Sequence, residues 1–91
     1  MEENLRRDME SAFGADFSEV RIHEGFLAPA IGALALTSGN EIHVAFGLYE
    51  PGAPRGRHLI AHELVHVAVS KKLMRFLLMI IERSEVPLLT F

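Results

Sequence analysis

The chain has 91 residues, enough for one small domain, and 49% of them are hydrophobic, which argues against a disordered segment. It contains no cysteine, so disulfides and thiolate metal sites are excluded, and five histidines remain as candidate metal ligands together with the carboxylates. The formal charge is -3 and the basic residues are scattered, so the composition gives no support for nucleic-acid binding.

The first third of the chain predicts a helix, a strand and a second helix. Residues Leu5 to Phe13 place apolar side chains on one helical face, and Gly14 is the expected stop. Residues Val20 to His23 alternate between polar and apolar, as a short strand does. Residues Leu27 to Leu36 are rich in alanine, which favours a helix.

The middle of the chain predicts a strand between a turn and a loop. Ser38-Gly39-Asn40 has the composition of a turn. Residues Glu41 to Phe46 alternate in the pattern of a half-buried strand. Residues Gly47 to Gly56 hold glycines and prolines and should form a loop, in which Pro54 suits the first position of a following helix.

The remainder of the chain predicts helix. It should run from Arg55 to at least Ser70, where Lys71-Lys72 fit either a last helical turn or a break. Residues Leu73 to Arg83 are again helical in composition, and an irregular end should begin at Ser84. The predicted order of helix, strand, helix, strand and helix indicates a single α+β domain over residues 1–91.

His62-Glu63-Leu64-Val65-His66 is an HExxH motif inside the last predicted helix. Residues four apart lie on one helical face, so both imidazoles can reach one metal ion. Glu63 would act as general base toward a water whose pKa zinc lowers to about 7. This pattern predicts a zinc site, and the alternative is a chance occurrence of the motif on a structural helix.

A catalytic zinc site needs a third protein ligand, and no histidine follows His66. Glu82 and Glu85 are the downstream carboxylates. An unbroken helix would place Glu82 about 24 Å from His66, so only a break near Lys71-Lys72 would bring them close. We therefore favour a solvated helix end for both glutamates.

Three histidines lie upstream of the motif. His43 alternates with two apolar neighbours and should face solvent if they face the core. His23 ends the first strand and fits either a metal ligand or an exposed strand end. His58 shares a helical stripe with the motif, but it lies about 12 Å along the axis from His66, so we place it at the mouth of the site.

Five segments of the chain have a characteristic order and spacing: Leu5–Glu10, Phe17–His23, Ala35–Ile42, Phe46–Gly52 and Gly56–Val67. Together they resemble a bacterial family of HExxH metallopeptidase-type domains, formerly a domain of unknown function. The family occurs in proteins associated with extracellular contractile injection systems and toxin-like cargoes. The resemblance covers roughly Leu5 to Ser70, and an apolar helical segment at about residues 72–83 is unmatched.

The resemblance implies a zincin-like fold in which His62 and His66 bind zinc and Glu63 is the catalytic base. The family favours a histidine at the end of the first strand, which makes His23 the candidate third ligand. One departure is Ala53, which stands where the family usually has Ser or Thr and so loses a helix N-cap worth about 1 kcal/mol.

Two functions are compatible with these residues. The first is a zinc-dependent metallopeptidase whose peptide or protein substrate pairs with the Glu41 to Phe46 strand by strand addition. The second is a catalytically weak or inactive zincin-like docking module of a toxin or injection-system-associated protein. In the second case Leu73 to Ile81 would bind a partner, whereas otherwise it would complete the core.

The expected location follows from the charged N-terminus, which is not a secretory signal, and from the absence of an apolar run long enough to span a bilayer. We expect a protein that is cytoplasmic as synthesised and is exported by a specialised injection system. The abrupt end on Leu-Leu-Thr-Phe is typical of a fragment or a truncated homologue.

Overall fold

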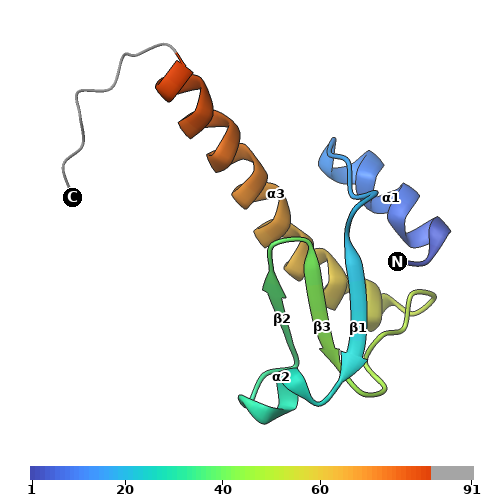
Figure 1. Cartoon of the computed structure of the whole chain (residues 1–91). Coiled ribbons are helices and arrows are strands. Elements are labelled where there is room, and N and C mark those ends of the chain that lie inside the picture. Colours follow the sequence, from blue (N-terminus) through green and yellow to red (C-terminus); the bar gives the residue numbers. More distant parts are fainter. Residues whose placement is uncertain (83–91) are drawn as a thin grey trace.

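The computed structural model describes residues 1–82, and side chains within 1–78. Its elements are α1 (Glu3–Phe13), β1 (Arg21–Gly25), α2 (Leu27–Ala30), β2 (Ala35–Ser38), β3 (Glu41–Ala45) and α3 (Pro54–Glu82). The three strands form one sheet, and the long helix α3 crosses behind it and extends beyond its end (Figure 1). The predicted α+β class is confirmed.

The strands lie in the order β1-β3-β2, so β3 is the central strand. β1 pairs with β3 in parallel, with His23 opposite His43, and β2 pairs with β3 antiparallel, with Thr37 opposite Ile42. Both sides of β3 are therefore occupied. The prediction that a peptide would add to Glu41–Phe46 is wrong, because β1 and β2 are the edges of this sheet.

The core lies between α3 and one face of the sheet. Ile42 and Val44 of β3 are fully buried, as are Ile60 and Leu64 of α3. Alternate residues of a strand point to opposite faces, so the Ile42 and Val44 face is the one that α3 covers. One cluster contains eight buried apolar side chains: Leu5, Phe17, Val20, Ile42, Val44, Ile60, Leu64 and Val67.

The first helix ends where the sequence predicts. Gly14 adopts φ 63°, a left-handed conformation that glycine takes without steric cost, and its N–H donates to the Glu10 carbonyl at 2.9 Å. Leu5 is the buried residue of α1 and enters the common core.

The predicted helix over Leu27–Leu36 is wrong in its second half. α2 ends at Ala30, and Gly32 then takes φ 74°, which an α-helix does not allow. Ala35–Ser38 forms β2 instead. Pairing with β3 supplies backbone hydrogen bonds over a stretch whose alanine content alone favours a helix.

The last helix is continuous from Pro54 to Glu82, so Lys71-Lys72 do not break it. Val67 is 1% exposed, whereas all described side chains from Lys72 to Leu78 are exposed. Within residues 1–82, no helix is both long and apolar enough to cross a bilayer.

Candidate metal centre

The two histidines of the HExxH motif lie one turn apart on α3. The His62 and His66 ring centroids are 5.5 Å apart and the rings are inclined by 77°. One ligand atom from each of His62, Glu63 and His66 lies within 4.8 Å of the others. Within the part of the chain that the structure describes, this is the one group of three such side chains that could hold a metal ion.

The three side chains of this group have different environments. His62 and His66 are exposed, whereas Glu63 retains 5% of its accessible surface. Each helical residue is rotated by about 100° from the one before it, which turns Glu63 from the histidine stripe toward the sheet. The two imidazoles are therefore open to a ligand from solvent, and the carboxylate lies beneath them.

The buried carboxylate has a specific partner in β2. Thr37 Oγ1 donates to Glu63 Oε1 at 2.9 Å and also lies 3.4 Å from the Glu63 carbonyl oxygen. A carboxylate buried without a hydrogen-bond donor would be costly, so Thr37 offsets part of the cost of burying Glu63. This contact fixes the motif against the edge strand of the sheet.

Thr37 was not predicted as a site residue, although the sequence holds a signal for its strand. Gly39-Asn40 is a two-residue connection of a kind typical of β-hairpins, and Gly39 has φ 59°. A hairpin at this turn pairs the residues before it with Glu41–Ala45. That pairing places Thr37 opposite Ile42 on the covered face of the sheet.

The outer edge of β2 lies beside the metal-binding group. The Ala45 N–H donates to the Leu34 carbonyl at 2.9 Å, which fixes which β2 residues bond to β3. In an antiparallel pair, residues whose backbone groups bond to the partner strand alternate with residues whose backbone groups point away from it. Leu34 bonds to β3, so the backbone N–H and C=O groups of Ala35 and Thr37 point away from β3. The residue that binds Glu63 therefore also presents backbone groups to the open edge.

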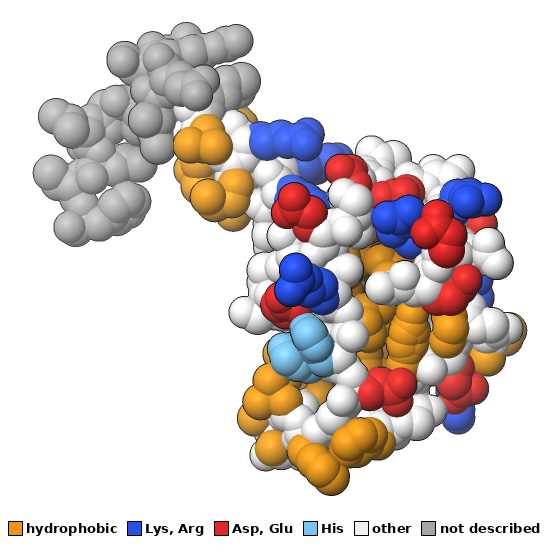
Figure 2. Space-filling model, turned by 45° about the vertical axis from the view of Figure 1, so that its right-hand side comes forward, with side chains coloured by type: hydrophobic (Ala, Val, Ile, Leu, Met, Phe, Trp, Pro, Cys, Tyr) orange, Lys and Arg blue, Asp and Glu red, His pale blue; other side chains and the backbone are white. Residues whose placement is uncertain are grey.

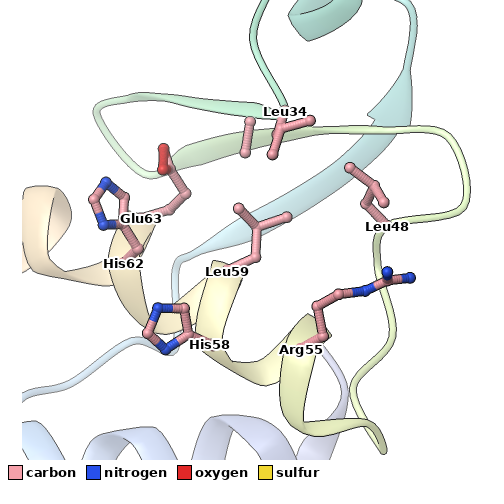
Figure 3. A pocket seen from close by; sticks show the side chains of 8 residues that line it. Leu34, Leu48, Arg55, His58, Leu59, His62 and Glu63 are labelled. Atoms are coloured by element: carbon pink, nitrogen blue, oxygen red, sulfur yellow. The ribbon is translucent and has the colours of Figure 1, made fainter.

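A pocket of about 590 Å³ opens next to the same residues. Figure 3 shows His62 and Glu63 at one end of it and Arg55 at the other, with Leu34, Leu48 and Leu59 directed between them. Its remaining lining residues are Ala35 and His58. His58, expected at the mouth of the site, thus shares this pocket with His62.

The structure does not bring His23 to the metal-binding group. His23 stacks on His43 with ring centroids 5.0 Å apart, and its Nε2 lies 2.6 Å from Glu41 Oε2. The hydrogen bond from His23 lowers the pKa of the Glu41 carboxyl below its usual value. Because Ile42 and Val44 face α3, His43 and the ring stacked on it lie on the opposite face, as predicted for His43.

The downstream glutamates are not brought to the histidines either. Since α3 is unbroken from Pro54 to Glu82, the backbone of Glu82 lies about 24 Å along the axis from His66. Glu85 lies outside the described residues. Thus the described carboxylate that accompanies the two histidines is Glu63.

Comparisons with known proteins identify the family of the chain. No curated protein and no solved structure matches the chain. Residues 1–73, which include every element up to the first two-thirds of α3, match the eCIS core domain. The chain therefore belongs to the eCIS core domain family, which is associated with extracellular contractile injection systems.

Proposed function

We propose that this eCIS core domain is a zinc-dependent peptidase. The observation that carries the proposal is the buried Glu63 carboxylate, held by Thr37 directly beneath the exposed His62 and His66 pair. Burying a carboxylate carries a desolvation cost that an apolar residue at position 63 would avoid, so a purely structural role does not account for it. A hydrolase needs this arrangement, because a base must lie beside the water that the metal activates.

The donor set fits zinc. Imidazole nitrogen is an ordinary zinc ligand, and the chain has no thiolate that would favour another metal. The two histidines would supply two of the three protein ligands that a catalytic zinc ion takes. His62 and His66 would hold the ion from the exposed side of α3. A bound zinc ion supplies an activated water and polarises the scissile carbonyl.

Glu63 would move the proton in this reaction. Its carboxylate would accept a proton from the attacking water and then donate it to the leaving amine. Thr37 would keep one carboxylate oxygen fixed through its 2.9 Å hydrogen bond, so that the other remains directed at the water. Thr37 is thus a positioning residue.

The substrate would bind along β2 in place of the strand predicted from the sequence. An extended peptide adds to an open sheet edge through main-chain hydrogen bonds. The outward peptide groups of Ala35 and Thr37 offer such bonds beside Glu63. A peptide at this edge would carry its backbone past the carboxylate.

The first test is zinc content and cleavage of an unstructured protein such as casein. The wild-type chain should bind one equivalent of zinc and cleave, and His62→Ala should lose both properties. His43→Ala is the control, because His43 lies on the sheet face opposite α3 and outside both the metal-binding group and the pocket. A wild-type protein that binds no zinc at equimolar concentration contradicts the proposal.

A second variant separates the two roles open to Glu63. Glu63→Gln should keep zinc and lose cleavage by at least about a hundredfold, the contribution typical of general-base catalysis. If Glu63→Gln instead releases the zinc, the carboxylate is a ligand and the assignment of Glu63 as the base is wrong.

A second candidate function is a docking module within an injection-system assembly. Its specific support is the far half of α3, where exposed apolar side chains lie on a helix segment that projects from the sheet (Figure 2). The described members are Val69, Leu73, Met74, Phe76, Leu77 and Leu78. Zinc-free protein whose molecular mass rises with concentration in light scattering would favour this function over the peptidase.

A further inference from the structure

The pocket beside the HExxH motif has a mainly apolar wall. Leu34, Leu48 and Leu59 line it between the two ends, and Ala35 of β2 completes that side. Leu59 is partly buried and packs against the core, whereas the Leu34 side chain is 66% exposed. An exposed leucine over a pocket adjoining a candidate catalytic group is a surface that a ligand would bury.

The apolar surface continues past the pocket. Phe26 and Phe46 meet edge to face with centroids 4.6 Å apart, although both remain more than half exposed. Leu27 and Ile31 of the α2 region are exposed as well. Figure 2 shows apolar side chains gathered at this lower end of the molecule, where Figure 1 places α2.

The charged residue at the rim does not favour an acidic ligand. Arg55 lies 3.2 Å from Glu50, so its charge is already paired. Its side chain is also 82% exposed, so an ion pair between Arg55 and an acidic ligand would lie in solvent and contribute little binding free energy. The pocket therefore favours an apolar side chain over a carboxylate.

We propose that this pocket selects substrates by binding one large aliphatic or aromatic side chain of an extended polypeptide. The inference rests on the proposed function, since it takes His62 and Glu63 as the reacting end of the pocket. Ala35 lines the pocket and Thr37 holds Glu63, and two strand residues span about 6.6 Å. The selected side chain thus belongs to a residue within about two positions of the cleaved bond.

Peptide binding tests the pocket without any cleavage. The probe is a ten-residue alanine- and serine-based peptide with Leu, Ala or Asp at one central position, added to metal-free Glu63→Gln protein. Binding is followed by shifts of protein NMR signals, which report weak affinities. The Leu peptide should bind about tenfold more tightly than the Ala peptide and tighter still than the Asp peptide.

A matched pair of variants locates the binding. Leu34→Glu should remove the preference for the Leu peptide, and Leu73→Glu should keep it, because Leu73 is similarly exposed but lies on the far half of α3. Thermal unfolding of both variants should match that of the parent. Equal binding of the three peptides, or equal loss in both variants, overturns the pocket assignment.

The outcomes separate this inference from the proposed function. If zinc and cleavage are found but sites of cleavage in casein show no large apolar residue within two positions, the peptidase stands and the pocket assignment fails. If no zinc binds but the Leu peptide is still preferred through Leu34, the pocket is a peptide site and the peptidase proposal fails.

Discussion

The two halves of α3 are both apolar, but they have different surroundings. In the first half, Ile60, Leu64 and Val67 recur at helical spacing and are buried against the sheet. In the second half, Leu73 and Phe76 are equally apolar but 55% exposed. The metal-binding group lies entirely in the half that the sheet supports.

The boundary between the halves is close to Lys71. Lys71 Nζ donates to the Asp16 carbonyl at 2.8 Å, a contact with the segment between α1 and β1. From Lys72 to Leu78 the described side chains are exposed. Apolar residues therefore hold a helix in position only where another element covers them, and the position of the HExxH residues depends on this cover.

The same substitution in each half of α3 should have very different effects on the free energy of unfolding. Leu64→Ala should lower the free energy of unfolding by about 2–5 kcal/mol, because Leu64 is fully buried and its truncation leaves a cavity. Leu73→Ala should change it by less than about 0.5 kcal/mol, because the residue is 55% exposed. Chemical denaturation of the isolated chain measures both. Equal losses would show that the far half is buried in solution, for example by self-association.

A second test concerns the start of the supported half. A Cβ atom added at Gly56 would lie 2.2 Å from the Glu50 carbonyl oxygen and 2.7 Å from its carbonyl carbon, and backbone atoms cannot move aside cheaply. Gly56→Ala should therefore destabilise the domain by about 2 kcal/mol, since overpacking at the upper end of its usual range exceeds the roughly 1 kcal/mol gain in helix propensity. Ser70→Ala, at an exposed helical position, is the control.

Urea denaturation of Gly56→Ala, Ser70→Ala and the parent measures the three free energies of unfolding. A Gly56→Ala domain as stable as the parent would mean that the loop before α3 can move away from the helix. In that case the first half of α3 would be less firmly held than its burial indicates.

The HExxH helix could be predicted from the sequence because its signals are local. The apolar spacing of Ile60, Leu64 and Val67 and the four-residue separation of His62 and His66 both follow from helical geometry. The α+β class followed from the alternation in Glu41–Ala45 and its helical neighbours. These features require no knowledge of which elements meet.

Long-range pairing limited the remaining predictions. The alanine-rich composition before Ser38 favoured a helix, but hydrogen bonds to β3 made it a strand and brought Thr37 to Glu63. His23 could be assigned to a strand, but β1 continues to Gly25, so the predicted strand end at His23 is wrong. Which sheet face α3 covers then decides whether His23 meets His62. Sheet order and the covered face depend on the whole core, which no single segment encodes.

A third substitution, with a smaller expected effect, tests the hydrogen bond between Thr37 of β2 and Glu63 of α3. Thr37→Val removes the hydroxyl that donates to the buried Glu63 carboxylate and should cost about 1–2 kcal/mol of stability. It should also lower the rate of zinc-dependent cleavage, since the carboxylate loses its fixed orientation, while zinc content stays unchanged. Thr37→Ser keeps the donor and should restore most of both properties. If Val and Ser variants behave alike, the hydroxyl does not position Glu63.

The smallest expected effect is a gain in stability from a substitution at the N-terminus of α3. The Ala53 carbonyl accepts from the Arg57 N–H at 2.9 Å, which makes Ala53 the residue that caps the helix, and its side chain supplies no acceptor. Ala53→Ser should raise the free energy of unfolding by about 1 kcal/mol and the melting temperature by about 4–8 °C. The same gain should raise zinc affinity little, because His62 lies more than two turns further along an already supported helix. Ala53→Val, which offers no acceptor, is the control. If Ala53→Ser and Ala53→Val have the same melting temperature, a side-chain cap on the first turn of α3 does not stabilise the domain.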